Sequence, residues 1–150
     1  MRDLRRQALA VEASALTLKP TPARPHVWGV VMETGYPEAA ATLVVFADGT
    51  TSMYFSSGGG VIGAGEHEPV RAAAGQLLSL AESQVSRFTP VADTSLPRAG
   101  RVKFFLRTFT GTLGAEAGET ELGAGTDRLS EVFLAAHAVI TAVREATPRE

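Results

Sequence analysis

The chain has 150 residues, 45% of them hydrophobic, which suits one compact domain and is short of two. Its 14 basic and 16 acidic residues leave a net charge of -2, so the composition gives no electrostatic signal for binding nucleic acid or an acidic membrane. The absence of cysteine excludes disulfides, thiolate metal sites and cysteine nucleophiles.

The sequence also lacks the signals of a membrane or exported protein. No apolar run approaches the roughly 20 residues that a membrane span needs. The N-terminus has no apolar signal core followed by a small-residue cleavage site. We therefore expect a cytoplasmic protein with no membrane span and no nucleic-acid partner.

The first 25 residues differ in character from the rest. Residues 1–16 place Leu4, Ala8 and Val11 at helical spacing, which predicts a short amphipathic helix. Three prolines follow within six residues, and such a segment favours an extended linker. We therefore divide the chain into an N-terminal helix with a Pro-rich linker, residues 1–25, and a single α+β domain, residues 26–150.

Strand patterns follow the linker. Residues 26–34 form a short β-branched run, and residues 41–57 predict a hairpin joined by a two-residue type I′ turn at Asp48-Gly49. In that register one sheet face carries four core side chains, Val44, Phe46, Met53 and Phe55. The opposite face, with Leu43, Val45, Ser52 and Tyr54, is too apolar for water. Either the N-terminal helix or another subunit would cover it.

The second half of the chain alternates between helical and extended patterns. Residues 68–88 carry an apolar stripe at helical spacing, and residues 129–146 predict a second long helix. Between them, residues 101–108 and 111–117 predict two hairpin-paired strands. Residues 118–127 read as a polar loop.

This order of elements, α-β-β-β-α-β-β-α, predicts an α+β fold with an antiparallel sheet of about five strands packed by helices. The order resembles that of profilin-like domains, including the roadblock group, although roadblock domains have two strands and then three. The resemblance implies terminal helices on one face of the sheet and the middle helix on the other. Three segments, residues 27–37, 47–68 and 137–141, also resemble those of a small set of bacterial proteins described only as hypothetical.

Five glycines stand among eight residues between the hairpin and the next helix. Gly58, Gly60 and Gly63 match the dinucleotide pattern GxGxxG, but they follow an antiparallel hairpin and no strand ends in an acidic residue about 20 positions later. The segment does not match a Walker motif, because Glu66 and His67 occupy the positions where Lys and a hydroxyl residue are required. The segment therefore predicts a tight connection, with glycines that allow positive φ and close backbone approach.

The same segment also supplies the candidate site residues. Glu66, His67 and Glu68 offer carboxylate and imidazole groups, which suit a divalent metal, and His67 with Glu68 are the candidate metal ligands. Further ligands would have to come from His137, His26 or Glu33. The candidate ligand-binding set comprises Gly58, Gly59, Gly60, Gly63, Gly65, Glu66, His67, Glu68 and His137.

His137 stands in the middle of an almost wholly apolar helix. One interpretation is a neutral core histidine with one ring nitrogen bonded to a carbonyl or hydroxyl. The other is a buried acid/base pair with His67 or Glu68, which would mark a cleft.

Two functions follow from these observations. The favoured one is a non-enzymatic protein-interaction or regulatory domain acting as a homodimer through the second sheet face or a sheet edge. It rests on the hairpin, which has apolar side chains on both faces, and on the lack of a complete set of catalytic residues. The sequence therefore argues against an enzyme without deciding the question. The alternative is a small-molecule or divalent-metal-binding protein, with or without an activity, centred on the glycine-rich loop. No other cofactor is predicted.

Overall fold

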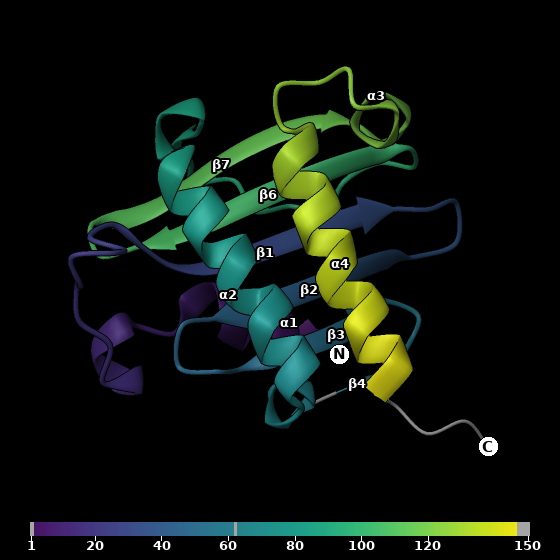
Figure 1. Cartoon of the computed structure of the whole chain (residues 1–150). Helices are drawn as coiled ribbons and strands as arrows, with labels where there is room; N and C mark the ends of the chain where they lie inside the picture. Colours follow the sequence, from purple (N-terminus) through teal and green to yellow (C-terminus); the bar gives the residue numbers. More distant parts are fainter. Residues whose placement is uncertain (1, 62, 147–150) are drawn as a thin grey trace.

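A long apolar run places one strand at the centre of the molecule. All nine residues of β1 (Val27–Gly35) are buried, which requires neighbours on both edges and both faces. The computed structural model describes residues 2–61 and 63–146, and these form a seven-stranded antiparallel sheet in the order β4-β3-β2-β1-β6-β7-β5 (Figure 1). The other strands are β2 (Ala40–Phe46), β3 (Thr51–Phe55), β4 (Gly60–Val61), β5 (Thr89–Pro90), β6 (Arg101–Thr108) and β7 (Gly111–Gly118).

The helices lie on both faces of this sheet. Those described are α1 (Arg2–Ala10), α2 (Glu68–Ser83), α3 (Glu119–Ala124) and α4 (Ser130–Ala146). Short 3-10 turns add η1 (Ala13–Leu16), η2 (Ala64–Glu66) and η3 (Val85–Arg87). The predicted class, α+β with an antiparallel sheet, is confirmed. None of the described helices is long and apolar enough to cross a membrane.

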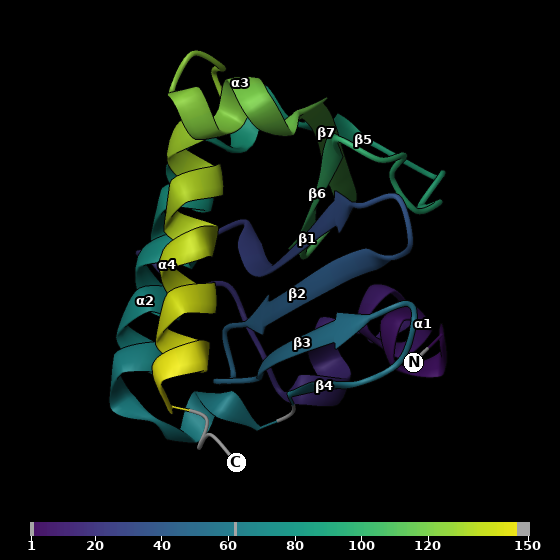
Figure 2. The ribbon, with the colours of Figure 1, turned by 90° about the vertical axis from the view of Figure 1, so that its right-hand side faces the viewer.

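The division of helices between the faces differs from the one that the profilin-like resemblance implies. The middle helix α2 and the C-terminal helix α4 lie side by side on one face, which we call the front face, and α1 lies on the opposite, back face (Figure 2). The front-face core joins the apolar stripes of both long helices to the sheet, with Leu77 and Val139 fully buried. A smaller core, with Trp28 and Phe105, lies under α1.

The hairpin register is one residue away from the predicted one. Leu43 pairs with Met53, where the sequence predicts Val44. The turn is the cause: Gly49 N donates to Phe46 O (3.1 Å), so three residues form the loop and the third has φ 99°. Relative to β2, the slip places each side chain of β3 on the other face of the sheet. The front core receives Leu43, Val45 and Met53, and the back core receives Val44, Phe46 and Tyr54.

The remaining differences concern short elements. β4 and β5 have two residues each, and α3 occupies six residues of the segment predicted as a polar loop. Elements of this length carry no readable hydrophobic period. α2 ends at Ser83 instead of continuing to residue 88, although Phe88 is buried as its place in the predicted stripe requires.

Candidate functional site

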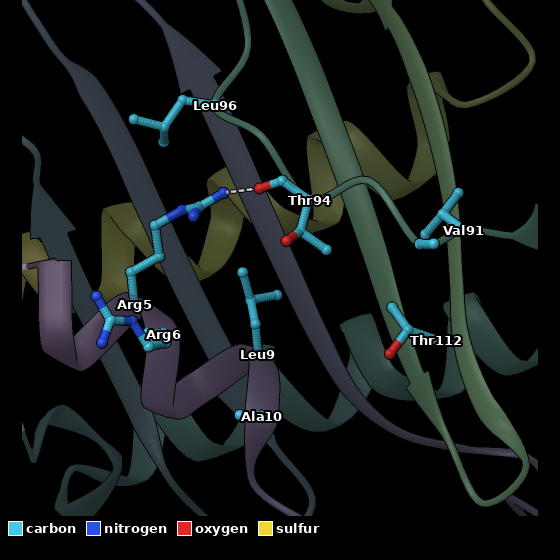
Figure 3. Close-up of a pocket in the computed structure, with 9 residues that line it drawn as sticks. Arg5, Arg6, Leu9, Ala10, Val91, Thr94, Leu96 and Thr112 are labelled. Atoms are coloured by element: carbon cyan, nitrogen blue, oxygen red, sulfur yellow. Dashed lines mark hydrogen bonds between the residues drawn. The ribbon is translucent and has the colours of Figure 1, made fainter.

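A hollow of about 770 Å³ opens on the back face between α1 and the segment 91–97, which is part of the connection from β5 to β6 (Figure 3). One wall is the side of α1 and the opposite wall is segment 91–97. Thr112 of β7 also lines the hollow. The lining residues are Arg5, Arg6, Leu9, Ala10, Val91, Ala92, Thr94, Leu96 and Thr112.

A second hollow of about 760 Å³ continues from the first. Both are lined by Leu9, Ala10 and Thr112, so they meet at the C-terminal end of α1. The second hollow extends past η1 to Trp28 and Arg107. We call the two hollows together the α1 trough. The trough begins beside α1 and extends beyond the C-terminal end of this helix, past η1 to residues 107–112.

Arg5 fixes α1 and connects the two walls of the trough. Its Nε donates to Glu33 Oε2 (2.5 Å) and its Nη2 to Glu33 Oε1 (2.7 Å), while Nη2 also donates to the carbonyl of Thr94 on the opposite wall (Figure 3). Glu33 is 0% exposed, and Thr42 Oγ1 donates to its Oε2 (2.7 Å). A carboxylate this deeply buried needs a cation, because an unpaired charge in an apolar interior is strongly unfavourable.

The opposite wall is held by its own contacts. Lys103 Nζ donates to the carbonyl (3.0 Å) and hydroxyl (3.2 Å) of Ser95. The backbone N–H of Ser95 donates to Asp93 Oδ1, and this hydrogen bond lowers the pKa of Asp93. Val91 packs where a side chain at Gly114 would stand, since a Cβ there would lie 2.9 Å from Val91 Cγ1. Segment 91–97 is therefore fixed to the sheet on both sides of Thr94.

At the other end of the trough, Arg107 of β6 caps the C-terminal end of α1. Its guanidinium donates to the carbonyls of Ala8 and Val11 (both 2.7 Å), which lie at the C-terminal end of the helix where carbonyls lack partners. The guanidinium carbon lies 4.7 Å from the ring centroid of Trp28. Burial lowers the pKa of Arg107. Among the described residues, Trp28 Nε1 and Arg107 Nε find no hydrogen-bond acceptor.

The glycine-rich segment lies elsewhere, at the β4 edge of the sheet. Gly58 and Gly59 form the turn between β3 and β4, and Gly60 begins β4. Gly63, Gly65 and Glu66 line a shallow depression of about 450 Å³ together with residues 48–52 and Arg71. Arg71 donates to the carbonyls of Gly65 (3.1 Å) and Glu66 (2.6 Å), which ties η2 to the first turn of α2.

The candidate metal ligands are not assembled into a cluster. His67 and Glu68 are exposed at the start of α2, and the described part of the chain holds no group of three or more His, Asp or Glu side chains able to bind one metal ion. The further ligands that the sequence offered have other partners. Glu33 is bound by Arg5 and Thr42, and His26 Nδ1 lies 2.8 Å from Glu82 Oε2.

His137 is a residue of α4 and is remote in sequence from the glycine-rich segment. It lines a separate, small cavity of about 30 Å³ between α4 and the sheet. Its neighbours there include Tyr36 and Arg144, but none of the glycine-loop residues. Its ring is 4.4 Å from that of Phe133, and its Nε2 has no partner among the described residues. Burial lowers the pKa of His137, and the nearby Glu119 opposes this shift. A half-buried, neutral imidazole is the result.

The trough was not foreseen from the sequence. Its lining comes from residues 5–18, 91–96 and 107–112 together with Trp28, and these separated positions form no motif. The one usable signal was the amphipathic N-terminal helix, whose position on the sheet depends on tertiary packing.

Comparisons of the chain with protein-family models, with curated proteins and with solved structures found no match.

Proposed function

We propose that the protein is a non-enzymatic interaction domain that binds an extended segment of a partner protein in the α1 trough. The observation that carries the proposal is that two adjacent hollows share Leu9, Ala10 and Thr112 in their linings. Pockets for small molecules are mostly enclosed and measure about 300–1,000 Å³. Two open hollows of that size in a row suit a chain of residues better than one compact ligand.

The lining favours a partner segment that carries both apolar and acidic side chains. Leu9, Val91 and Leu96 supply apolar walls. The charged residues that line the trough are Arg5, Arg6, Arg107 and Glu12, so cations predominate, although Glu33 already balances Arg5. Carboxylates on the partner would complement this charge. Backbone carbonyls of an extended segment would also offer acceptors to the donor-rich walls.

The experiment is a selection of displayed random 12-residue peptides on the purified protein. Selected peptides should share apolar side chains and carboxylates, and their affinity should fall about tenfold or more in Ala10→Glu, because the new carboxylate stands where the two hollows meet. Ala72→Glu is the matched control, since Ala72 is an exposed alanine of α2 on the front face.

Two outcomes would refute this function. One is that no peptide is enriched above a support without protein. The other is that enriched peptides bind Ala10→Glu and Ala72→Glu equally well, which would place the binding surface away from the trough. Binding abolished by Ala72→Glu alone would move the site to the front face.

A further inference from the structure

The second hollow of the trough contains two buried N–H groups without an acceptor. Trp28 of β1 is 2% exposed and Arg107 of β6 is 7% exposed, and both side chains line this hollow. Among the residues that the structure describes, Trp28 Nε1 and Arg107 Nε have no hydrogen-bond partner. A buried donor in this state is unfavourable, because it gives up its hydrogen bonds to water and gains none from the protein. Both donors therefore need an acceptor.

Arg107 also carries a buried charge whose partners within the described part of the chain are neutral. Its guanidinium donates to the carbonyls of Ala8 and Val11 and lies against the ring of Trp28. Burial lowers the pKa of Arg107, and the charge of Glu12 opposes this shift. Glu12 is exposed, so solvent screens its effect. A carboxylate in direct contact would stabilise the buried cation far more strongly.

A β-bulge brings the two donors to the same face of the sheet. The register of β1 against β6 shifts between Val27 and Gly29, so Trp28 is an extra residue in β1. Val31 lies in the back core, and strict alternation from it would turn Trp28 to the front face. The bulge returns the indole ring to the back core. Gly29 leaves room beside it, since a Cβ there would lie 3.2 Å from Arg107 Cβ.

The space next to these donors suits a small organic group. The hollow measures about 760 Å³, within the range of about 300–1,000 Å³ that is typical of ligand pockets. Leu9, Leu18 and Phe109 supply apolar walls, whereas the exposed residues Glu12 and Thr110 lie at its mouth. An acid with an apolar body would match both the donors and the walls.

We propose that the second hollow is a binding site for an organic carboxylate, whose oxygens accept hydrogen bonds from Trp28 Nε1 and Arg107 Nε. The guanidinium carbon lies 4.7 Å from the indole ring centroid, so one carboxylate can bridge the two donors. Both N–H groups are closed off from solvent, and the side chains around them must shift slightly to admit the ligand. The carboxylate belongs either to a free acid or to a side chain of a bound protein segment. The inference does not rest on the function proposed for the trough, since a free acid would fill the site equally well.

Trp28 makes the site directly observable, because it is the one tryptophan of the chain. In the isotope-labelled full chain, its indole N–H gives a single signal in a proton–nitrogen correlation spectrum. Benzoate and hexanoate are the probes for a free acid, and the neutral compounds benzamide and hexanamide are their matched controls. We expect the acids to move the indole proton signal downfield until the site is saturated. The amides lack the charge and should bind at least about tenfold more weakly.

Substitutions test the contact with Arg107. Arg107→Lys keeps the charge but removes Nε, so it should weaken benzoate binding about tenfold or more. Arg101→Lys, at the exposed start of the same strand, is the matched control and should leave the affinity unchanged. If Arg107→Lys does not fold, because this residue also caps α1, then Trp28→Phe removes the indole donor alone. The backbone amide signals of residues 107–112 would then report the same loss of affinity.

A capped peptide with one glutamate between leucines distinguishes the two sources of the carboxylate. A shift with benzoate and hexanoate means that the site accepts a free acid, and a shift with the peptide alone assigns the carboxylate to a partner segment. Three results would overturn the proposal. One is no shift with any carboxylate at tens of millimolar, and another is equal binding of acids and amides. The third is a signal that is already downfield in the protein alone and moves upfield in Glu12→Gln, because the chain's own carboxylate would then occupy the donors.

Discussion

Glu33 shows how one residue sets the position of a whole element. It points from the central strand into the back face, where its neighbours are mostly apolar, and its two oxygens are taken by Arg5 and Thr42. A buried ion pair is a poor source of net stability, because removing two charges from water costs about as much as their attraction returns. The ion pair instead selects the position at which α1 docks on the sheet. Apolar packing alone would tolerate a sliding α1, whereas the bidentate pair permits a single position.

Glu82 joins two elements at the opposite end of β1. Its side chain is 11% exposed and accepts hydrogen bonds from the backbone N–H groups of His26 and Val27 (both 2.8 Å), besides its contact with the His26 ring. Burial acts to raise the pKa of Glu82, but these hydrogen bonds outweigh it, and the pKa is lowered from the ordinary 4.5. The folded protein therefore prefers the ionised form.

The lowered pKa predicts how stability depends on pH. The contribution of Glu82 is complete above its ordinary pKa and is lost as the pH falls through the lower pKa of the folded state. Glu82→Gln should lower the free energy of unfolding by about 1–2 kcal/mol at pH 7. The gap between wild type and variant should narrow as the pH falls below the ordinary pKa of 4.5, in urea unfolding at a series of pH values. A gap that stays constant over this range would contradict the assignment.

At the scale of elements, the glycine-rich segment is an edge of the sheet as well as a connection. β4 pairs with β3 through Met53 and Tyr54, and η2 then packs against the β2–β3 turn. A Cβ at Gly65 would lie 1.8 Å from the carbonyl oxygen of Gly49, so the two backbones touch only because no side chain intervenes.

Gly65→Ala should therefore destabilise the protein, since neither backbone can move away without disturbing the turn. We expect a loss of about 1–3 kcal/mol in the free energy of unfolding, measured by chemical denaturation. Gly75→Ala is the matched control, because Gly75 is a helical glycine of α2 with nothing within 4 Å of the added Cβ. That change should stabilise the protein by about 0.5–1 kcal/mol. Similar effects of the two substitutions would disprove the close contact.

The long elements could be predicted from the sequence because each buries a continuous face. The strand at residues 101–108 and the helix over residues 129–146 carry enough alternating or helical apolar positions to be read directly. The hairpin register could not be predicted in this way. Asp48-Gly49 suits loops of either two or three residues, and a difference of one residue places the side chains of β3 on the opposite face relative to those of β2.

The candidate site was less predictable for a different reason. Arg5 is one of several arginines in an amphipathic helix, and nothing local reveals that its partner is Glu33, 28 positions away. The sequence analysis instead selected the glycines, because five of them are clustered, and His67, because an imidazole can bind a metal. Their neighbours in space are backbone and Arg71. Whether they bind a ligand stays a prediction.

At the scale of the whole molecule, stability should fall from the centre of the sheet outward. β1 lies between β2 and β6 and is covered on both faces, so its amides become exposed only when the whole fold opens. β4 and β5 are two-residue edges, and α1 is a single short helix held by few anchors. We therefore expect the sheet to unfold as one cooperative unit, whereas α1 can undock without it.

Hydrogen exchange followed by mass spectrometry tests this order. Amides of β1 should exchange slowest, and those of α1 faster, through local undocking that leaves β1 protected. Arg5→Ala should speed exchange in α1 by about a hundredfold or more, because docking then buries Glu33 without its cation, at a cost of about 3–5 kcal/mol. Gln7→Ala, at an exposed position of the same helix, should change exchange in α1 far less. If α1 and β1 exchange together in the wild-type protein, then α1 is part of the global unfolding unit and does not undock by itself.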